Sequence, residues 1–536
     1  MEYLGSARVG AHASAKSERS EMRKVIFGSS LGTAFEWYDF FVFGTLAAIL
    51  GPLFFSKDLG ETGAFLAGLA TYGAGLVLRP FGSLLFGKLG DVTGRKTTFM
   101  ITMALMGVST AGVGLLPTYE TAGLAAPILL VVLRCLQGLA LGGEYGGAAT
   151  YVAEHASHGR RGYATGWIQI CATIGFFLSL IVVLACQSAL EAEQFKSWGW
   201  RLPFLLSVGL FGVSMYIRSR LHESPVFLRM KAAGQLTKSP IKDSFGNWAN
   251  LKVILLALFG AVAGSGIIWY TGQFYALIFL QKSLKIEFGT AYVLMSIALA
   301  LATPFFVFFG WLSDRIGRKK IMMGVFMLAS MTYIPIFKGL LHYGNPALER
   351  AIAAAPVVIH SNECSVRAFS GPVTDCEKVK ELLNSASVPH TLVAASTAGV
   401  STTLGNASVS GFDATKLRAA IKSAGYPDHA ASEQINRPMV VCLLFILVLY
   451  VCMGYGPIAA YLVELFPTKV RYSSISMPYH IGTGYFGGFM LYFATLITTT
   501  TGDIFAGLWY PIVIAIVSLL IGLVFLPETK DWDINR

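Results

Sequence analysis

Two acidic residues in one long apolar segment have the types and spacing needed to bind and release a proton. Glu36 and Asp39 lie three residues apart, so a helix places both carboxyl groups on one face. A lone carboxylate deep in a bilayer costs about 2.5–3.5 kcal/mol or more unless it is paired or protonated. Burial raises the pKa of such an acid and a nearby arginine lowers it, so an arginine contact that comes and goes would load and unload a proton. We expect this role for Asp39 first and for Glu36 and Glu144 next; the alternative is a permanent structural ion pair.

Two arginines within other apolar segments are the candidate partners of these acids. Arg79 and Arg134 stand in surroundings where an arginine nearly always faces a cavity or a partner. The fixed fork of guanidinium donors suits a carboxylate that is held by two parallel hydrogen bonds. Both residues could therefore bind an anionic substrate, and the alternative is that either one serves only as the counterion of an acid.

Other polar side chains interrupt the apolar segments and are candidates for the lining of the same cavity. Gln169 lies in one segment, and Tyr270 and Gln273 lie in another. Aromatic residues near a helix end are as often anchors at the membrane interface as they are cavity lining, so both interpretations stay open. His480 lies near the start of a late apolar segment, and we interpret it as a satisfied helix-end residue rather than a proton carrier.

A loop of ten residues occurs twice, and its charges could hold helices together in one conformation. The pattern Gly-x3-Asp-x2-Gly-Arg-Lys begins at Gly87 and again at Gly310. Glycines let helices approach closely, and each aspartate can pair with the arginine or with a neighbouring helix end in one state only. The expected conformational latch comprises Gly87, Asp91, Gly94, Arg95, Gly310, Asp314, Arg315, Gly317 and Arg318. The alternative is that the basic residues only anchor these loops on the inner side of a membrane.

A second repeat indicates that the chain is built from two related halves. Glu154-x6-Arg161 follows one apolar segment and Glu464-x6-Arg471 follows its counterpart, and we add these four residues to the expected latch. The ten-residue loop recurs after 223 residues and this second motif after 310, so the second half carries about 87 extra residues between its two motifs.

The composition is that of a membrane protein. Of the 536 residues, 54% are hydrophobic and 13% are charged, against roughly a quarter charged in soluble domains. Twelve apolar stretches approach the length needed to cross about 30 Å of hydrocarbon. They lie at 25–50, 64–86, 97–116, 125–153, 162–187, 201–219, 250–280, 288–311, 320–341, 437–462, 473–499 and 508–526.

The basic residues lie on alternate loops, which sets the expected orientation. With the N-terminus inside, the inner segments hold 25 Lys and Arg residues and the short outer loops hold few. This asymmetry predicts a bacterial inner-membrane protein with both termini cytoplasmic, and it argues against nucleic-acid binding as the reason for the net charge of +11. The polar residues 1–24 lack the pattern of a cleavable signal peptide and are expected to form a disordered cytoplasmic leader.

These observations divide the rest of the chain into bundles, connections and an insertion. We expect a six-helix bundle at 25–219, a cytoplasmic linker at 220–249, a second six-helix bundle from 250–341 and 437–526, and a cytoplasmic tail at 527–536. The extra residues fall at 342–436, where no apolar run is long enough to span. Short apolar runs alternate there with amphipathic stretches at Asp375–Ser385 and Asp413–Ala424, which favours a small periplasmic α/β subdomain. The alternative is a largely disordered loop.

The cysteines and histidines give one candidate disulfide and no metal site. Cys364 and Cys376 both fall in the outer insertion, where disulfides persist in a bacterium, so they are the candidate pair. No Cys/His spacing resembles a metal site. The insertion also shows no nucleophile with a base and an orienting acid, because His360 and His390 are isolated.

Several strings of residues are similar to those of a known family. They are Phe35-Glu36-Trp37-Tyr38-Asp39-Phe40-Phe41, Arg79-Pro80-Phe81-Gly82, Arg134-x2-Gln137-Gly138-x3-Gly142-Gly143-Glu144-Tyr145, Glu154-x6-Arg161-Gly162 and Glu464-Leu465-Phe466-Pro467-Thr468-x2-Arg471. The chain resembles the major facilitator superfamily and, within it, the metabolite:H⁺ symporter family, over nearly all of 22–341 and 437–530. That family includes transporters for α-ketoglutarate, citrate, shikimate and proline or betaine, so the resemblance implies proton-coupled uptake of a small polar metabolite. The insertion at 342–436 is not part of the family's usual pattern.

We therefore expect an all-α integral membrane fold of twelve helices in two pseudo-symmetric bundles, with a small α/β insertion outside the membrane, and a transporter rather than an enzyme. The expected function is proton symport of a small organic acid by alternating access, with a site near the midplane between the bundles. The expected partners are that substrate, H⁺ and the lipid bilayer, with no cofactor, no metal and a monomeric chain.

Two other functions stay open. One is an osmoprotectant symporter for proline or betaine; the osmosensing members of that branch resemble one another in a long charged C-terminal extension, whereas this chain ends at Arg536. The other is a membrane sensor or enzyme that uses the insertion at 342–436.

Overall fold

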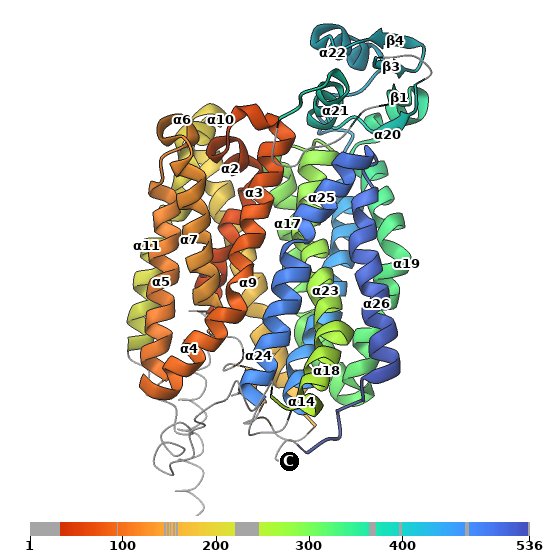
Figure 1. The fold of residues 1–536 in the computed structure, drawn as a ribbon. Helices are drawn as coiled ribbons and strands as arrows, with labels where there is room; N and C mark the ends of the chain where they lie inside the picture. Colours follow the sequence, from red (N-terminus) through yellow and green to blue (C-terminus); the bar gives the residue numbers. More distant parts are fainter. Residues whose placement is uncertain are drawn as a thin grey trace, which may run out of the picture.

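Two helical bundles stand side by side, and a small α/β insertion lies over one end of them (Figure 1). The computed structural model describes residues 33–93, 95–143, 146, 149–150, 152–153, 156, 159–219, 246–362, 364, 371–395, 399–466 and 471–533, apart from the side chains of 87–88, 90–93, 95–96, 99, 217–219 and 472–473. The expected leader 1–24 and most of the expected linker 220–249 lie outside these residues. We call the end that carries the insertion the insertion end; the C-terminus lies at the opposite end.

The N-terminal half forms the first bundle. The helix Thr33–Thr45 turns by 62° at Leu46 into α2 (Ala47–Phe54). The other long helices are α3 (Gly60–Val77), α4 (Arg79–Thr93), α5 (Arg95–Leu115), α7 (Ala125–Leu141), α9 (Arg161–Ala189) and α11 (Arg201–Ser219). Short elements between them are η1 (Lys57–Leu59), α6 (Tyr119–Ala122), α10 (Ala192–Gln194) and η2 (Phe195–Gly199). Because α4 follows α3 after a one-residue break at Leu78, Arg79 begins the second helical segment of one apolar span.

The C-terminal half forms the second bundle. Its seventh span runs from Trp248 to Ser283 and alternates α-helical with π-helical turns, a feature that is frequent at functional sites. The elements of this span are α14 (Trp248–Ala257), η3 (Leu258–Val262), α15 (Ala263–Tyr270), η4 (Thr271–Tyr275), α16 (Ala276–Ile278) and η5 (Phe279–Ser283). The rest are α17 (Phe288–Ala302), α18 (Phe305–Ile316), α19 (Arg318–Gly344), α23 (Arg437–Leu465), α24 (Arg471–Ile481), η6 (Gly482–Gly488), α25 (Met490–Thr501), η7 (Ala506–Leu508) and α26 (Trp509–Phe525).

The helices of the described part account for the expected twelve spans. Eight are long and apolar enough to cross a membrane, and the bent pair Thr33–Thr45 and Ala47–Phe54 gives a ninth. Three shorter apolar helices are Met100–Leu115, Ala125–Leu141 and Arg201–Tyr216. The predicted all-α membrane fold with a small α/β insertion is confirmed.

Glycines let α7 pack backbone to backbone against α3 and α4. A Cβ atom at Gly138 would overlap the carbonyl oxygen of Gly75, and a Cβ atom at Gly142 would overlap that of Arg79. Such small residues replace side-chain packing where helices must approach closely. This contact fixes the backbones that carry Arg79 and Arg134 next to each other.

The insertion contains a four-stranded sheet and three helices. In chain order its elements are α20 (Pro346–Ala354), β1 (Val357–His360), α21 (Asp375–Ser385), β2 (His390–Val393), β3 (Ser401–Leu404), β4 (Ala407–Ser410) and α22 (Ala414–Ser423). The strand order is β2-β1-β3-β4, with β1 and β2 parallel and the other pairs antiparallel. Cys364 and Cys376 form a disulfide between the segment after β1 and the first turn of α21.

His390 is buried where the insertion meets the second bundle. The side chain is 4% exposed, its Nδ1 lies 3.0 Å from the carbonyl oxygen of Val388, and its backbone N–H donates to the carbonyl of Gly502. Burial lowers the pKa of His390 from 6.5 to about 4, and the charge of Lys380 acts in the same direction. An unfolded His390 therefore binds a proton between about pH 6.5 and 4 that the folded one does not, so stability is lost as the pH falls through this window.

We predict that local opening of the insertion becomes easier by about 3 kcal/mol between pH 7 and pH 4, given about 1.4 kcal/mol for each pKa unit. Hydrogen exchange of the β1 and β2 amides, corrected for intrinsic rates, measures this change. A His390→Gln variant should lose most of the pH dependence, whereas the exposed His429→Gln should keep it. Equal pH dependence in all three proteins would contradict the role of His390.

Candidate functional site

Charged and polar side chains are buried between and beside the two bundles. The exposed fractions are 3% for Glu36, 4% for Asp39, 1% for Arg79, 0% for Arg134 and 4% for Gln169. From the second bundle, Gln273 and His480 are 0% exposed. Because burying an isolated charge is costly, each of these groups must be explained by a partner, a proton or a ligand.

Asp39 lies in the first helix, inside the first bundle. It forms no ion pair with Arg79 or Arg134, and its Oδ1 has no hydrogen-bond partner among the described residues. The next residue, Phe40, uses its carbonyl oxygen to accept a hydrogen bond from Arg134 at 3.3 Å. Arg134 therefore contacts the backbone of the residue after Asp39, and not the Asp39 carboxylate.

Arg134 contacts groups of its own bundle, although its Nε and Nη2, like those of Arg79, have no hydrogen-bond partner among the described residues. Its Nη1 donates at 2.6 Å to Oε1 of Gln137, whose Nε2 donates to Thr110 at 2.7 Å. The guanidinium carbon lies 4.4, 4.5 and 5.1 Å from the ring centroids of three aromatic residues, namely Phe40, Phe43 and Tyr72. Rings at these distances attract a cation electrostatically, so Arg134 joins the first helix to α3 and α7.

Arg79 instead reaches the other bundle. Its Nη1 lies 3.5 Å from the hydroxyl oxygen of Thr483, in η6, and its guanidinium carbon lies 5.5 Å from the ring of Trp37. Nε and Nη2 have no hydrogen-bond partner among the described residues. These two nitrogens form the edge of a guanidinium that binds a carboxylate with two parallel hydrogen bonds.

Polar groups of the second bundle lie around the same region. His480 lies three residues before Thr483, the contact of Arg79, and neither of its ring nitrogens has a side-chain partner among the described residues. Neither amide atom of Gln273 has a partner there either. Sequence reasoning did not identify Thr483. It interpreted His480 as a satisfied helix-end residue, and the structure places this residue in the last turn of α24 with its side chain buried.

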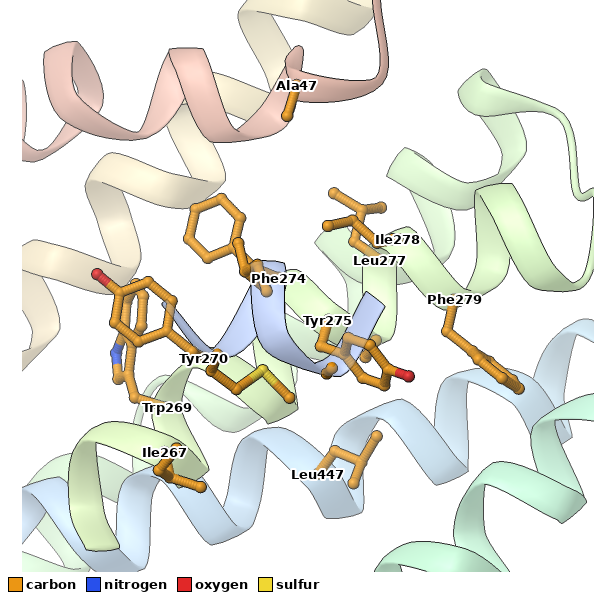
Figure 2. Close-up of a cluster of buried hydrophobic side chains, with 14 of the residues drawn as sticks. Ala47, Ile267, Trp269, Tyr270, Phe274, Tyr275, Leu277, Ile278, Phe279 and Leu447 are labelled. Carbon is orange, nitrogen blue, oxygen red and sulfur yellow. The ribbon is translucent and has the colours of Figure 1, made fainter. Parts of the chain in front are cut away.

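Aromatic rings join the two bundles toward the insertion end. Phe41 of the first bundle lies 5.0 Å from Trp269 and 5.3 Å from Phe274, measured between ring centroids, and Phe176 lies 4.3 Å from Phe274. Figure 2 shows Trp269, Tyr270 and Phe274 side by side along the seventh span. Beyond them, the hydroxyl of Tyr292 donates to the carbonyl of Thr45 at 3.0 Å. The bundles are therefore in contact on this side of the buried charges.

The bundles also touch at the opposite end, through the second copy of the repeated loop. Gly162 of α9 and Gly310 of α18 are so close that a Cβ atom on either would overlap the carbonyl oxygen of the other. The Asp314 carboxylate accepts hydrogen bonds from the backbone N–H groups of Gly162 and Tyr163 at 2.9 and 2.8 Å. These donors are at the start of α9, where the positive end of the helix dipole favours an acid.

A buried network of charges extends from this contact. Arg318 lies 2.7 Å from Asp314 and 3.0 Å from Glu464, measured between nitrogen and oxygen, and Arg161 lies 3.5 Å from Glu464. Thr529, just before the C-terminus, also donates to Glu464 at 2.7 Å. Arg161 is from one copy of the second motif and Glu464 from the other, so the network crosses the boundary between the halves.

For the remaining described residues of the expected latch, the structure shows other contacts than those of this charge network. Arg471 is 2% exposed and its Nε donates to the carbonyl of Phe466 at 3.1 Å. Arg315 stacks on Trp311 at 4.1 Å, away from the network, and Gly317 has φ +112° and leaves room for the Glu528 carboxylate. Outside the described residues or side chains lie Glu144, Glu154, Gly87, Asp91, Gly94 and Arg95. No group of three or more His, Cys, Asp or Glu residues in the described part could hold a metal ion.

Two helical bundles that meet around buried charges are the architecture of a secondary transporter. The sequence model of the Major Facilitator Superfamily matches residues 30–344 of this chain. The chain therefore belongs to this superfamily, as the resemblance of its motifs predicted, and it is a transporter and not an enzyme.

The relatives include metabolite and osmoprotectant transporters. Over 330 residues the chain is 37% identical to the inner membrane metabolite transport protein YhjE of Escherichia coli (strain K12), a match that covers 61% of this chain and 74% of the relative. It is 35% identical over 327 residues to a proline/betaine transporter of Salmonella typhimurium, covering 59% of this chain and 64% of that one. The chain thus spans less than two thirds of the proline/betaine relative.

Solved structures show the same fold. A crystal structure of a D-xylose-proton symporter superimposes with a TM-score of 0.62 at 16% identity, covering 95% of this chain and 99% of that chain. The partially occluded inward open conformation of the xylose transporter XylE from E. coli gives a TM-score of 0.58 at 15% identity, with the same coverage. At such identity the likeness extends to the fold and not to the substrate.

Proposed function

We propose that this transporter is a symporter that imports a small carboxylate-bearing metabolite together with a proton across the bacterial inner membrane. The observation that carries the proposal is the edge of Arg79. This guanidinium is buried, it contacts both bundles, and its Nε and Nη2 have no partner among the described residues. A substrate carboxylate would satisfy both nitrogens and supply the missing negative charge.

Asp39 is the proposed proton carrier. A buried carboxyl group with no ion-pair partner among the described residues is tolerable when it is protonated and costly when it is ionised. Rocking of the bundles would expose Asp39 to water or to a cation in another state, which would release the proton. Glu36 and Glu144 remain secondary candidates for this role.

The orientation follows from the charge asymmetry of the loops. The insertion would lie in the periplasm, and both termini and the network around Glu464 would lie in the cytoplasm. In this orientation, the contacts at the two ends of the bundles would close the site from both sides of the membrane. We propose that Asp314, Arg318, Arg161 and Glu464 form the cytoplasmic latch that opens when the substrate is released.

An uptake assay identifies the substrate class. Cells that lack their own transporters for these compounds should accumulate one or more labelled small mono-, di- or tricarboxylates when they express this chain, and a protonophore should abolish the accumulation. Uptake of sugars or cationic amines, with no uptake of any carboxylate, would refute the proposal.

A proline or betaine substrate is the second candidate, and a specific feature favours it. Such a zwitterion also carries a carboxylate for Arg79, and the buried aromatic residues Trp269 and Tyr270 of the seventh span could attract its ammonium group. Glycine betaine and proline therefore belong in the same panel, and uptake of these alone would select this function.

We predict that Glu464→Gln loosens the cytoplasmic latch. The change removes the charged partner of the buried Arg161 and one of the two carboxylates that pair with Arg318, which should lower stability by about 1–3 kcal/mol, somewhat less than full removal of a buried ion partner. Thermal unfolding in detergent measures this loss. Glu433→Gln, at an exposed glutamate of the same half, should change it by less than about 0.5 kcal/mol. Equal effects of the two changes would contradict the latch.

A further inference from the structure

The insertion is attached mainly to the second bundle. From α21, the Lys380 ammonium donates to the carbonyl of Thr500 at 2.8 Å and the Asn384 amide donates to that of Thr499 at 3.1 Å. Elsewhere, Lys285 donates to the carbonyl of Pro427 at 2.9 Å, and the hydroxyl of Ser387 donates to that of Lys282. With this many bonds, and with both of its ends continuing into α19 and α23, the insertion must move with the second bundle.

One side chain of α21 reaches the first bundle. Oε1 of Glu381 accepts a hydrogen bond from the backbone N–H of Thr62 at 2.8 Å. Thr62 is in the first turn of α3, where backbone N–H groups have no partner inside the helix and the dipole favours negative charge. The bond therefore joins a charged group of the insertion to the end of a helix in the opposite half.

A glycine at the start of α3 leaves space for the Glu381 carboxylate. Gly60 begins α3 with φ +73°, and a Cβ atom there would lie 2.6 Å from Oε1 of Glu381. A second close approach follows nearby, since a Cβ atom at Gly371 would overlap the carbonyl oxygen of Asp58. Figure 1 shows α21 over the insertion end of α3 and α25, which belong to different bundles.

The same arrangement occurs at the other end of the molecule. There Asp314, from the second bundle, accepts hydrogen bonds from the first N–H groups of α9, from the first bundle. At each end, then, an acid of the second half binds the start of a helix of the first half. Opening either end separates the bundles there and must break the corresponding bond.

We propose that the insertion is a clasp, carried by the second bundle, that holds the insertion end closed through Glu381 and the start of α3. Its release is a step in opening that end toward the substrate. The clasp lies outside the two bundles, so it adjusts how often the transporter opens and leaves the binding site itself unchanged.

Distance measurements between spin labels test the clasp without substrate or proton gradient, so their result is independent of the proposed function. Labels at Thr121 in α6 and at Glu287 before α17 report the separation of the two halves at the insertion end, after replacement of the free cysteines Cys135, Cys171, Cys186, Cys442 and Cys452. Glu381→Ala should increase the ratio of open to closed molecules by about tenfold, as expected for loss of one charge-assisted hydrogen bond.

Two further variants make the outcome decisive. Glu381→Gln keeps the shape and one acceptor oxygen but not the charge, so it should give a smaller increase in the same direction. Asp375→Asn removes a charge from the exposed start of the same helix, where Asp375 contacts Lys378 and not the first bundle, and should leave the distances unchanged. Unchanged distances in both Glu381 variants, or an equal shift with Asp375→Asn, would overturn the proposal.

Discussion

Replacing Asp39 by asparagine is expected to abolish uphill accumulation of substrate while leaving exchange of substrate across the membrane intact. An inwardly directed gradient of one pH unit supports about tenfold accumulation for each coupled proton, because one unit is worth about 1.4 kcal/mol. Asparagine imitates the protonated carboxyl group in shape and charge, so the variant should still change conformation. It has no proton to release, so its accumulation ratio should stay near one.

Proteoliposomes loaded with unlabelled substrate measure exchange, and a pH jump measures accumulation. The matched control is Asp503→Asn, at an exposed aspartate of the loop before η7, which should behave as the wild type. If Asp39→Asn accumulates substrate tenfold at one pH unit, the proton binds elsewhere, and Glu36 and Glu144 become the residues to change next.

Substitution of Arg79 is expected to have the largest effect on substrate affinity. Removing one partner of a buried, hydrogen-bonded charge pair costs about 2 kcal/mol or more, so Arg79→Gln should weaken binding about 30-fold or more. Arg79→Lys keeps the charge but loses the two parallel donors, and it should fall between this variant and the wild type. Binding of the substrate found in the uptake panel, measured by calorimetry on purified protein, gives these values.

Arg134 provides the contrast for this prediction. Its Nε and Nη2 also have no hydrogen-bond partner among the described residues, but its Nη1 donates to Gln137 and to the Phe40 carbonyl, and the three aromatic rings near it all belong to the first bundle. Arg134→Lys should therefore lower the unfolding temperature more than it lowers affinity. If the Arg134 variant lost substrate binding and the Arg79 variants retained it, the two arginines would have the opposite roles.

The sequence was sufficient for the architecture because membrane spans leave strong local signals. Long apolar runs, alternating basic loops and two repeated motifs gave the helices, the two halves and the position of the insertion. Within the insertion, the amphipathic stretch at Asp375–Ser385 forms α21 with those bounds. The hairpin of β3 and β4 was not anticipated, because Ser401–Leu404 and Ala407–Ser410 are too short and too polar to show an apolar strand pattern.

The partners of the functional residues could not be read in the same way. Arg79 meets Thr483, which lies 404 residues further along the chain, and no local pattern predicts such a contact. Asp314 accepts hydrogen bonds from backbone N–H groups at the start of α9. Nearly every residue type has such a donor, so the sequence does not reveal which ones Asp314 contacts. The sequence offered both Arg79 and Arg134 as candidates for substrate contact, and only their surroundings in the structure separate an arginine that contacts both bundles from one that contacts a single bundle.

The most direct test of the central claim is whether substrate movement drives proton movement through Asp39. Purified protein in liposomes that contain a pH-sensitive dye, with equal pH on both sides, receives the identified substrate from outside. The proposal predicts that the interior becomes acidic as substrate enters and that the Asp39→Asn protein takes up substrate with no change in internal pH. Substrate entry without acidification by the wild type, or equal acidification by the variant, would contradict it.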